Sequence, residues 1–250
     1  MSESEQAWLG WHRPNPQATL RLFCFPYGGG GASTFKDWQD YFPESIEVCP
    51  VQIPGREERL NEPRFTHPIR LVEAITDSLS KLFDRPFALF GHSLGAIIAF
   101  QLARQLRREE SARPLHLFVS GYQAPQIPDS GPRLQELPVQ QFIAALHKRN
   151  FIRREIMEKS RMLEFITPIL KSDYEMLQNY SYEPEAPLDF PITAFAGEED
   201  FEEGADKLES WREQTRASFS LYTFPGDHFF IHSAQSSLLN IINEQLQAYL

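Results

Sequence analysis

A serine stands between two glycines in the segment Gly91-His92-Ser93-Leu94-Gly95. The apolar run 87–90 before it predicts a strand buried on both faces, and residues 94–106 repeat their apolar side chains at helical spacing. Glycines on both sides let a strand reverse sharply into a helix and hold the serine in a strained turn with its hydroxyl exposed. The pattern therefore predicts a nucleophile elbow with Ser93 as the nucleophile.

A serine hydroxyl is a poor nucleophile at neutral pH, so it needs a base that is itself oriented by a third group. Of the seven histidines, His228 follows the apolar run 219–224 and a Pro-Gly-Asp turn, which places it on a loop after a late strand. We predict that His228 is the base. His92 is held beside the nucleophile and points elsewhere, and His232 can belong to the following helix. The remaining histidines lack a strand-end position: His12, His67, His116 and His147.

The orienting acid is sought at another strand end. The run 192–196 is followed by Gly197-Glu198-Glu199-Asp200, and Asp200 is the preferred acid because it comes just after the glycine turn. The order Ser93, Asp200, His228 is that of α/β-hydrolases. The competing carboxylates are Glu198, Glu199, Glu202 and Asp227.

Acyl transfer at a serine also needs backbone N–H groups aimed at the developing oxyanion. The glycine-rich segment 25–31, FPYGGGG, follows the first clear strand and can bring bare backbone close to a substrate. We expect the Leu94 amide to supply one donor and Gly28 the other. A phosphate-binding loop is the rival interpretation, but the G-x-x-x-x-G-K-[ST] pattern is absent.

The whole chain predicts one α/β domain over residues 1–250, because 42% hydrophobic content suits a sizeable core and no linker divides the sequence. Alternating strands and helices imply a mostly parallel central sheet flanked by helices. The expected strands are 20–25, 46–51, 87–90, 115–120, 192–195 and 219–224. The expected helices are 69–83, 94–106, 205–215 and 233–249.

Residues 121–191 break this alternation, because they contain proline-punctuated helical patterns and no convincing strand. A crossover needs only about a dozen residues, so the segment predicts a helical lid insertion at about 123–185 that covers the serine. Its helical patterns are 139–149, 153–160 and 167–180. Most of its apolar side chains are expected to pack within the insertion and some to line an acyl pocket: Phe142, Leu146, Phe151, Ile156, Met162, Phe165, Ile169 and Leu177.

Charge and composition restrict the partners. The net charge of −10 argues against nucleic acid, and a polar, acidic start without a long apolar run predicts a cytoplasmic protein that does not enter a membrane. Cys24 and Cys49 lie in predicted strands, which favours buried apolar packing over a disulfide or a metal site. Two basic groups are interpreted as solvated surface near helix ends, with carrier docking as the alternative: Arg104, Arg107, Arg108 and Arg113, and Lys148, Arg149, Arg153 and Arg154.

Several motifs in order give a more specific indication: FCFPYGGGGAS, PGREERLNEP, GHSLGA, LFVSGYQAP, ILKSDYEMLQNY, FAGEED and FPGDHFF. With them the chain resembles the type II thioesterases, stand-alone α/β-hydrolases that serve nonribosomal peptide and polyketide synthases. The resemblance implies Ser93, Asp200 and His228 as the triad, and monomeric action on acyl or peptidyl carrier proteins. Phosphopantetheine would arrive on the carrier, so no resident cofactor or metal is expected. Relatives fused to synthases often carry the acid near residues 120–122, where this chain has no carboxylate.

Three alternatives remain at this point. The same triad would serve a carboxylesterase, a lipase or an acyltransferase. A medium-chain acyl-carrier thioesterase of fatty acid synthesis would differ mainly in its chain-length optimum. A catalytically silent carrier-binding module would bind without turnover.

Overall fold

The computed structural model describes residues 3–128, 131–152 and 154–250. In these residues six strands form one sheet, in the order β2-β1-β3-β4-β5-β6, and every neighbouring pair is parallel. All six predicted strands are confirmed, with ends that differ by no more than two residues. They are β1 (Leu20–Phe25), β2 (Ile46–Pro50), β3 (Phe87–His92), β4 (Leu117–Ser120), β5 (Ile192–Gly197) and β6 (Phe219–Phe224).

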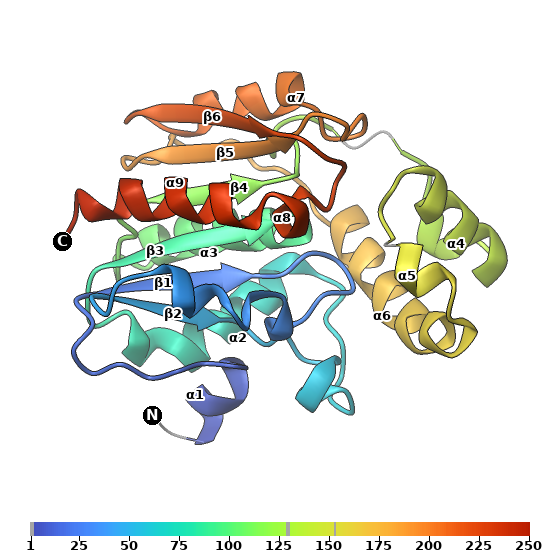
Figure 1. The fold of residues 1–250 in the computed structure, drawn as a ribbon, viewed down its shortest axis with the longest axis horizontal. Helices are drawn as coiled ribbons and strands as arrows, with labels where there is room; N and C mark the ends of the chain where they lie inside the picture. Colours follow the sequence, from blue (N-terminus) through green and yellow to red (C-terminus); the bar gives the residue numbers. More distant parts are fainter. Residues whose placement is uncertain (1–2, 129–130, 153) are drawn as a thin grey trace.

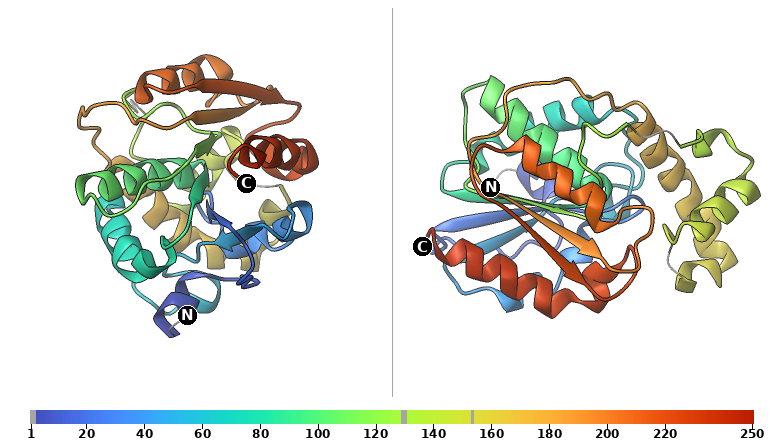
Figure 2. Two further views of the ribbon diagram at one scale, coloured as in Figure 1. Left: turned by 90° about the vertical axis from the view of Figure 1, so that its left-hand side faces the viewer. Right: turned by 90° about the horizontal axis from the view of Figure 1, so that it is seen from above.

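Helices cover both faces of the sheet (Figures 1 and 2). One face packs against α1 (Glu3–Trp8), α2 (Pro68–Leu79), α3 (Leu94–Arg108) and α7 (Ala205–Glu209). The other packs against α8 (Phe230–Ser233) and α9 (Gln235–Gln247). Successive strand side chains point to opposite faces, so Phe23 joins the first core and Leu22 and Cys24 join the second. This arrangement confirms the predicted α/β class.

A helical cover lies beyond the carboxyl ends of the strands (Figure 1). It contains α4 (Val139–Lys148), α5 (Arg154–Met157) and α6 (Ser160–Gln178). The start predicted for the last helix, Thr167, is wrong by seven residues because Pro168 lies inside the helix. Proline removes one backbone donor there, but the helix continues through it, and the Thr167 hydroxyl donates to the Leu163 carbonyl at 2.5 Å.

The cover has a small core of its own. Its buried members, the cover cluster, come from α4, α5, α6, the turn before α4 and the connection between α4 and α5: Leu134, Phe142, Ile143, Leu146, Ile152, Ile156 and Leu170. Of the other side chains predicted to pack or line a pocket, Ile169 is buried, whereas Met162 and Phe165 are largely exposed. Most of the insertion's apolar residues therefore stabilise the cover itself.

The arginines at the end of α3 correct one prediction. Arg104 is only 2% exposed, and Arg104, Arg107 and Arg108 all bond the carboxylate of Glu185, at 2.5, 2.6 and 2.8 Å. These groups bind the segment after α6 to α3, so the prediction of a solvated face is wrong for Arg104, whereas Arg108 and Arg113 are exposed as predicted. In the second group Arg149 lies 4.0 Å from Glu202, and Arg153 lies outside the described residues.

Two further predictions concern membranes and cysteines. In the described part of the chain, no helix is both long and apolar enough to cross a membrane. Cys24 and Cys49 are buried free thiols, as predicted, and burial raises the pKa of each well above its ordinary value. They therefore pack as small apolar groups.

The strand order creates a switch point in the sheet between β1 and β3. The order reverses at β1, so the connections after β1 and β3 leave on opposite sides of a crevice at the carboxyl end of the sheet. Such a switch point is where open α/β sheets bind ligands. Gly28 follows β1 and Ser93 follows β3, so the two predicted site segments meet there.

Candidate active site

The turn after β3 holds Ser93 in a strained backbone conformation, with φ 54° and ψ −119°. This turn needs glycine on both sides. A Cβ at Gly91 would lie 2.0 Å from the Gly95 carbonyl oxygen, and one at Gly95 would lie 2.1 Å from the Phe25 carbonyl oxygen. The Ser93 N–H donates to the Ser120 carbonyl at 2.7 Å. The elbow is thus held between β1 and β4, as a nucleophile turn requires.

His228 and Asp200 meet on the loops that follow β6 and β5. The His228 Nδ1 atom lies 2.7 Å from Asp200 Oδ2, and both side chains are at least 95% buried. A carboxylate only accepts, so His228 donates from Nδ1 and its Nε2 is left to accept a proton. The other Asp200 oxygen accepts the Glu203 N–H at 3.1 Å. Both carboxylate oxygens are therefore used to fix one ring orientation.

The competing acids lie elsewhere. Glu198 and Glu199 are exposed, and Asp227 accepts the Phe229 N–H at 2.9 Å within the turn itself. Glu202 lies 4.0 Å from Arg149 on the cover. The carboxylate that bonds His228 is the one that the strand-end position favoured.

His92 has a part that the sequence did not indicate. Its Nε2 lies 2.9 Å from the His228 carbonyl oxygen and its Nδ1 lies 2.8 Å from the Ser120 hydroxyl. A carbonyl only accepts, so His92 donates from Nε2 and accepts at Nδ1. Burial, with His228 as a further cause, holds its pKa well below the ordinary value. The neutral ring thus ties the His228 loop to β4.

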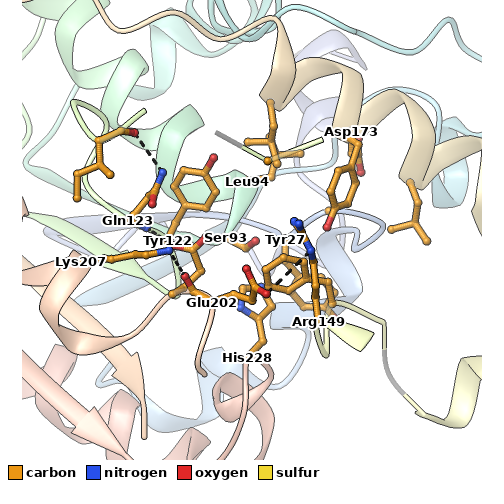
Figure 3. Close-up of a pocket in the computed structure, with 18 of the residues that line it drawn as sticks. Tyr27, Ser93, Leu94, Tyr122, Gln123, Arg149, Asp173, Glu202, Lys207 and His228 are labelled. Atoms are coloured by element: carbon orange, nitrogen blue, oxygen red, sulfur yellow. Dashed lines mark hydrogen bonds and ion pairs between the residues drawn. The ribbon is translucent and has the colours of Figure 1, made fainter. Parts of the chain in front are cut away.

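Ser93 and His228 line a pocket of about 510 Å³ beneath the cover (Figure 3). Both side chains come from loops at the end of the sheet. Phe151 and Leu177 are the two predicted lining residues of the cover that reach the pocket. The Phe151 ring packs edge-on against His228, with centroids 4.6 Å apart. Five aromatic side chains contribute to the wall: Tyr27, Tyr122, Phe151, Tyr174 and Phe229.

Two backbone segments beside Ser93 suit an oxyanion. Leu94 opens α3, and the first N–H groups of a helix have no acceptor within the helix. Gly28 lines the same pocket in a turn that the Gly30 N–H closes onto the Tyr27 carbonyl at 2.9 Å. Gly29 has φ 77°, a conformation that the third position of a type II turn requires. Both predicted donors therefore border the pocket that contains Ser93.

Comparison with known proteins identifies this arrangement. The thioesterase domain family model matches residues 20–246. The chain belongs to the thioesterase family. This thioesterase is 42% identical to the gramicidin S biosynthesis protein GrsT of Aneurinibacillus migulanus, over 94% of this chain and 92% of GrsT. It is 35% identical to the medium-chain S-acyl fatty acid synthase thioesterase of Rattus norvegicus, over 87% and 83% of the two chains.

A solved structure supports the same assignment. The type II thioesterase BorB from the borrelidin biosynthetic cluster superposes with a TM-score of 0.87 and 29% identity, over 96% of this thioesterase and 98% of BorB. The α/β-hydrolase fold and the resemblance to type II thioesterases are thereby confirmed. The protein is a hydrolase of thioesters, so the prediction of an enzyme is confirmed over that of a silent binding module.

One cluster outside the pocket has the donor atoms of a metal site. One ligand atom each of His12, Glu47 and Cys49 lies within 4.8 Å of the others. However, Arg21 donates to Glu47 Oε2 at 2.8 Å, and its positive charge opposes a bound cation. Desolvation raises the pKa of Glu47, but hydrogen bonds from His12 and Arg21 outweigh it and bring the pKa to about 2. We therefore interpret His12, Arg21 and Glu47 as a structural ion-pair cluster.

Proposed function

We propose that this thioesterase hydrolyses acyl thioesters on the phosphopantetheine arm of carrier proteins, and so clears misprimed or stalled nonribosomal peptide or polyketide synthases. The names of GrsT and BorB, which place those proteins in biosynthetic pathways, support this substrate class. Phosphopantetheine belongs to the substrate in this proposal, so the enzyme needs no cofactor of its own. Carrier proteins are the expected partners.

The observation that carries the proposal is the Asp200–His228 hydrogen bond beside the strained Ser93. In the proposed mechanism His228 Nε2 takes the Ser93 proton as Oγ attacks the thioester carbonyl. Asp200 keeps the ring in the orientation that leaves Nε2 free and stabilises the imidazolium that forms. The pantetheine thiolate then leaves with a proton from His228, and an acyl-serine remains.

The Leu94 and Gly28 N–H groups are assigned to the tetrahedral oxyanion. Losing one such donor costs about 10²–10³-fold in kcat in serine hydrolases, so their placement matters as much as the triad. Water then attacks the acyl-serine as His228 takes its proton, and that proton passes to Ser93 Oγ as the acid leaves. Serine and histidine end this cycle in their starting states.

The side chains that line the pocket determine how strongly the enzyme discriminates between acyl chains of different length. Aromatic rings surround Ser93, and each buried methylene of an acyl chain contributes only about 0.8 kcal/mol. Discrimination between neighbouring chain lengths is therefore shallow. Such breadth suits an enzyme that removes varied acyl groups from stalled carriers.

The test is intact-mass monitoring of an acetyl-phosphopantetheinyl carrier protein with wild-type enzyme and with Ser93→Ala, beside a matched oxoester. We expect only the wild type to strip the carrier, and the oxoester to react much more slowly. Survival of the acyl carrier while the oxoester is cleaved would contradict the proposed substrate and leave the triad intact. Covalent labelling of Ser93→Ala by a labelled acyl substrate would contradict the assigned nucleophile.

The similarity to the rat enzyme supports a second candidate, a medium-chain thioesterase of fatty acid synthesis. The two candidates differ in their dependence on chain length. A series of acyl carriers from acetyl to hexadecanoyl would give a flat profile for a clearing enzyme. One sharp optimum at medium length would favour the second candidate.

A further inference from the structure

A buried ion pair joins the cover to the segment after β2. Arg56 Nη2 donates to Asp173 Oδ1 at 2.6 Å, and Arg56 Nη1 donates to Asp173 Oδ2 at 3.1 Å. The side chains are 3% and 1% exposed. Arg56 follows β2 and Asp173 lies on α6, so the pair links elements more than one hundred residues apart. The proposed mechanism uses neither residue.

Both members of the pair also bond the backbone of the glycine turn. Asp173 Oδ2 accepts the Gly29 N–H at 2.7 Å, and Arg56 Nη1 donates to the Gly30 carbonyl at 2.8 Å. Hydrogen bonds in which one partner is charged are the stronger ones in proteins. The turn is therefore held by the ion pair from two sides.

Planarity of the peptide bond transmits this hold to Gly28. Its own N–H belongs to the Tyr27–Gly28 peptide, whose carbonyl accepts the Gly30 N–H at 2.9 Å inside the turn. In a trans peptide the N–H points opposite to the carbonyl, so the Gly28 N–H points away from that bond. The next peptide, Gly28–Gly29, is fixed because its N–H, that of Gly29, donates to Asp173. Both peptides that flank the Gly28 Cα thus have set orientations.

Helix α6 also packs directly on this turn. A Cβ at Gly29 would lie 2.8 Å from Leu170 Cδ2 and 3.3 Å from Ile166 Cδ1. A Cβ at Gly28 would lie 3.7 Å from Asp173 Cβ. The contact leaves little room for the turn to shift while α6 stays in place.

We propose that Arg56 and Asp173 are positioning residues that hold the Gly28 N–H in its oxyanion-binding orientation and make α6 a fixed wall of the active site. The inference rests on the oxyanion role proposed above for Gly28. Under it, α6 stays in place while substrate enters, and access depends on the outer helices α4 and α5. The pair acts through the backbone and does not touch the reacting atoms.

The test compares steady-state kinetics of the wild type and Asp173→Asn on acetyl-pantetheine and on p-nitrophenyl acetate. The asparagine keeps the size of the side chain but removes the charge that holds Arg56. Misplacement of a donor by about 1 Å costs about 10²-fold, so we expect kcat to fall about 10²-fold on both substrates. KM should change less than about threefold, and the pH profile should keep its shape because Asp200 and His228 are untouched.

A matched control separates positioning from general stability. Glu47→Gln breaks another buried ion pair, with Arg21, on the far part of β2. We expect it to lower the melting temperature about as much as Asp173→Asn does, with kcat unchanged. If both variants lost stability and both kept wild-type kcat, the Arg56–Asp173 pair would be structural only and the inference would be wrong.

Arg56→Lys serves if Asp173→Asn fails to fold. Lysine keeps a charge beside Asp173 but lacks the planar fork that bonds Asp173 and the Gly30 carbonyl together, so we expect an intermediate loss of kcat. A rise in KM with unchanged kcat in either variant would overturn the inference, because the pair would then serve substrate binding. Hydrolysis of the p-nitrophenyl ester uses the same oxyanion site but needs no carrier. If the wild type cleaved this ester but not acyl carriers, only the proposed substrate would be contradicted, and the ester would still test the role of the ion pair.

Discussion

The two halves of the cover are attached to the body in different ways. Helix α6 is held by the Arg56–Asp173 pair, and just after it Asn179 donates to the Thr66 carbonyl at 2.9 Å and Gln101 donates to the Tyr180 hydroxyl at 2.9 Å. The outer half, α4 and α5, packs mainly on the cover cluster. Its links to the body include the 4.0 Å Arg149–Glu202 pair and the edge of Phe151 on His228.

This difference shows that one insertion performs two tasks. The inner half has polar bonds to backbone and buried charges, which fix geometry. The outer half packs on the cover cluster, which it shares with Leu170 of α6 but which is separate from the two cores of the sheet, so it can move with small loss of contact to the sheet. Chemistry should therefore depend on the body and α6, and access should depend on α4 and α5.

The largest expected effect lies wholly in the body. In Asp200→Asn the amide no longer enforces the ring orientation of His228, and the corresponding change in serine proteases lowers kcat about 10⁴-fold. We expect a loss of that order with normal folding by circular dichroism. A near-normal kcat would show that another carboxylate, such as Asp227, orients the base.

A cavity in the cover cluster should separate the two halves. Phe142 is fully buried there, and Phe→Ala in a core costs about 3–5 kcal/mol. We expect Phe142→Ala to speed amide hydrogen exchange in α4 and α5 by a large factor and to change kcat little. Exchange in α6 after Pro168 should rise less, because Asp173 also holds that helix to the body, although Lys171 and Tyr174 contact Phe142. Equal acceleration throughout α4, α5 and α6 would mean that the cover opens as one body.

At the junction of α6 and the glycine turn, we expect Gly29→Ala to lower kcat about 10²-fold. Alanine is strained at φ 77°, and its methyl group would press on Leu170. The measurement is kcat with the melting temperature of the same sample. An alanine variant with wild-type kcat would show that the turn tolerates displacement from α6.

The smallest effect concerns the anchor after α6. Desolvation raises the pKa of Glu185, but hydrogen bonds from Arg104, Arg108 and Arg107 outweigh it and bring the pKa to about 2. The pKa is lower in the folded state than the ordinary 4.5, so this stabilisation is complete above about pH 4.5 and is lost as pH falls toward 2.

Glu185→Gln should therefore lower the free energy of unfolding by about 1 kcal/mol at pH 7, a value that allows for solvent screening of this partly exposed group. The difference from wild type should shrink as pH falls from 4.5 toward 2. Urea unfolding at pH 7, 4 and 3 measures it. A difference that stayed constant with pH would show that the carboxylate charge does not hold this anchor.

Local patterns were sufficient to predict the sheet and the ends of its strands. The strand β1, which is buried along its whole length, was predicted to the residue. So was β6, although it lies at the edge of the sheet and is mostly half-buried or exposed. Ser93, Asp200 and His228 each follow a predicted strand, which made strand ends the natural place to seek them. The parallel order then brings those ends together, as the 2.7 Å Asp200–His228 bond shows.

The failures share a physical cause, which is that they depend on distant parts of the chain. Arg104 looked like a solvated helix end, but its burial follows from Glu185 and from the carbonyl of Glu183, which local sequence does not place. The predicted start at Thr167 put Pro168 in the first turn of the helix, yet packing of α6 outweighs the one backbone donor that proline lacks. The pairing of Arg56 with Asp173 joins two motifs that the sequence displays only separately.

The backbone of Ser93 has a consequence for how such a protein persists over generations. A non-glycine residue held at φ 54° and ψ −119° costs on the order of 1–3 kcal/mol, which the rest of the fold must offset. Glycine at position 93 would remove that strain together with the reactive hydroxyl. A substitution that increased stability at this position would thus abolish turnover, and only continued natural selection for turnover retains the serine.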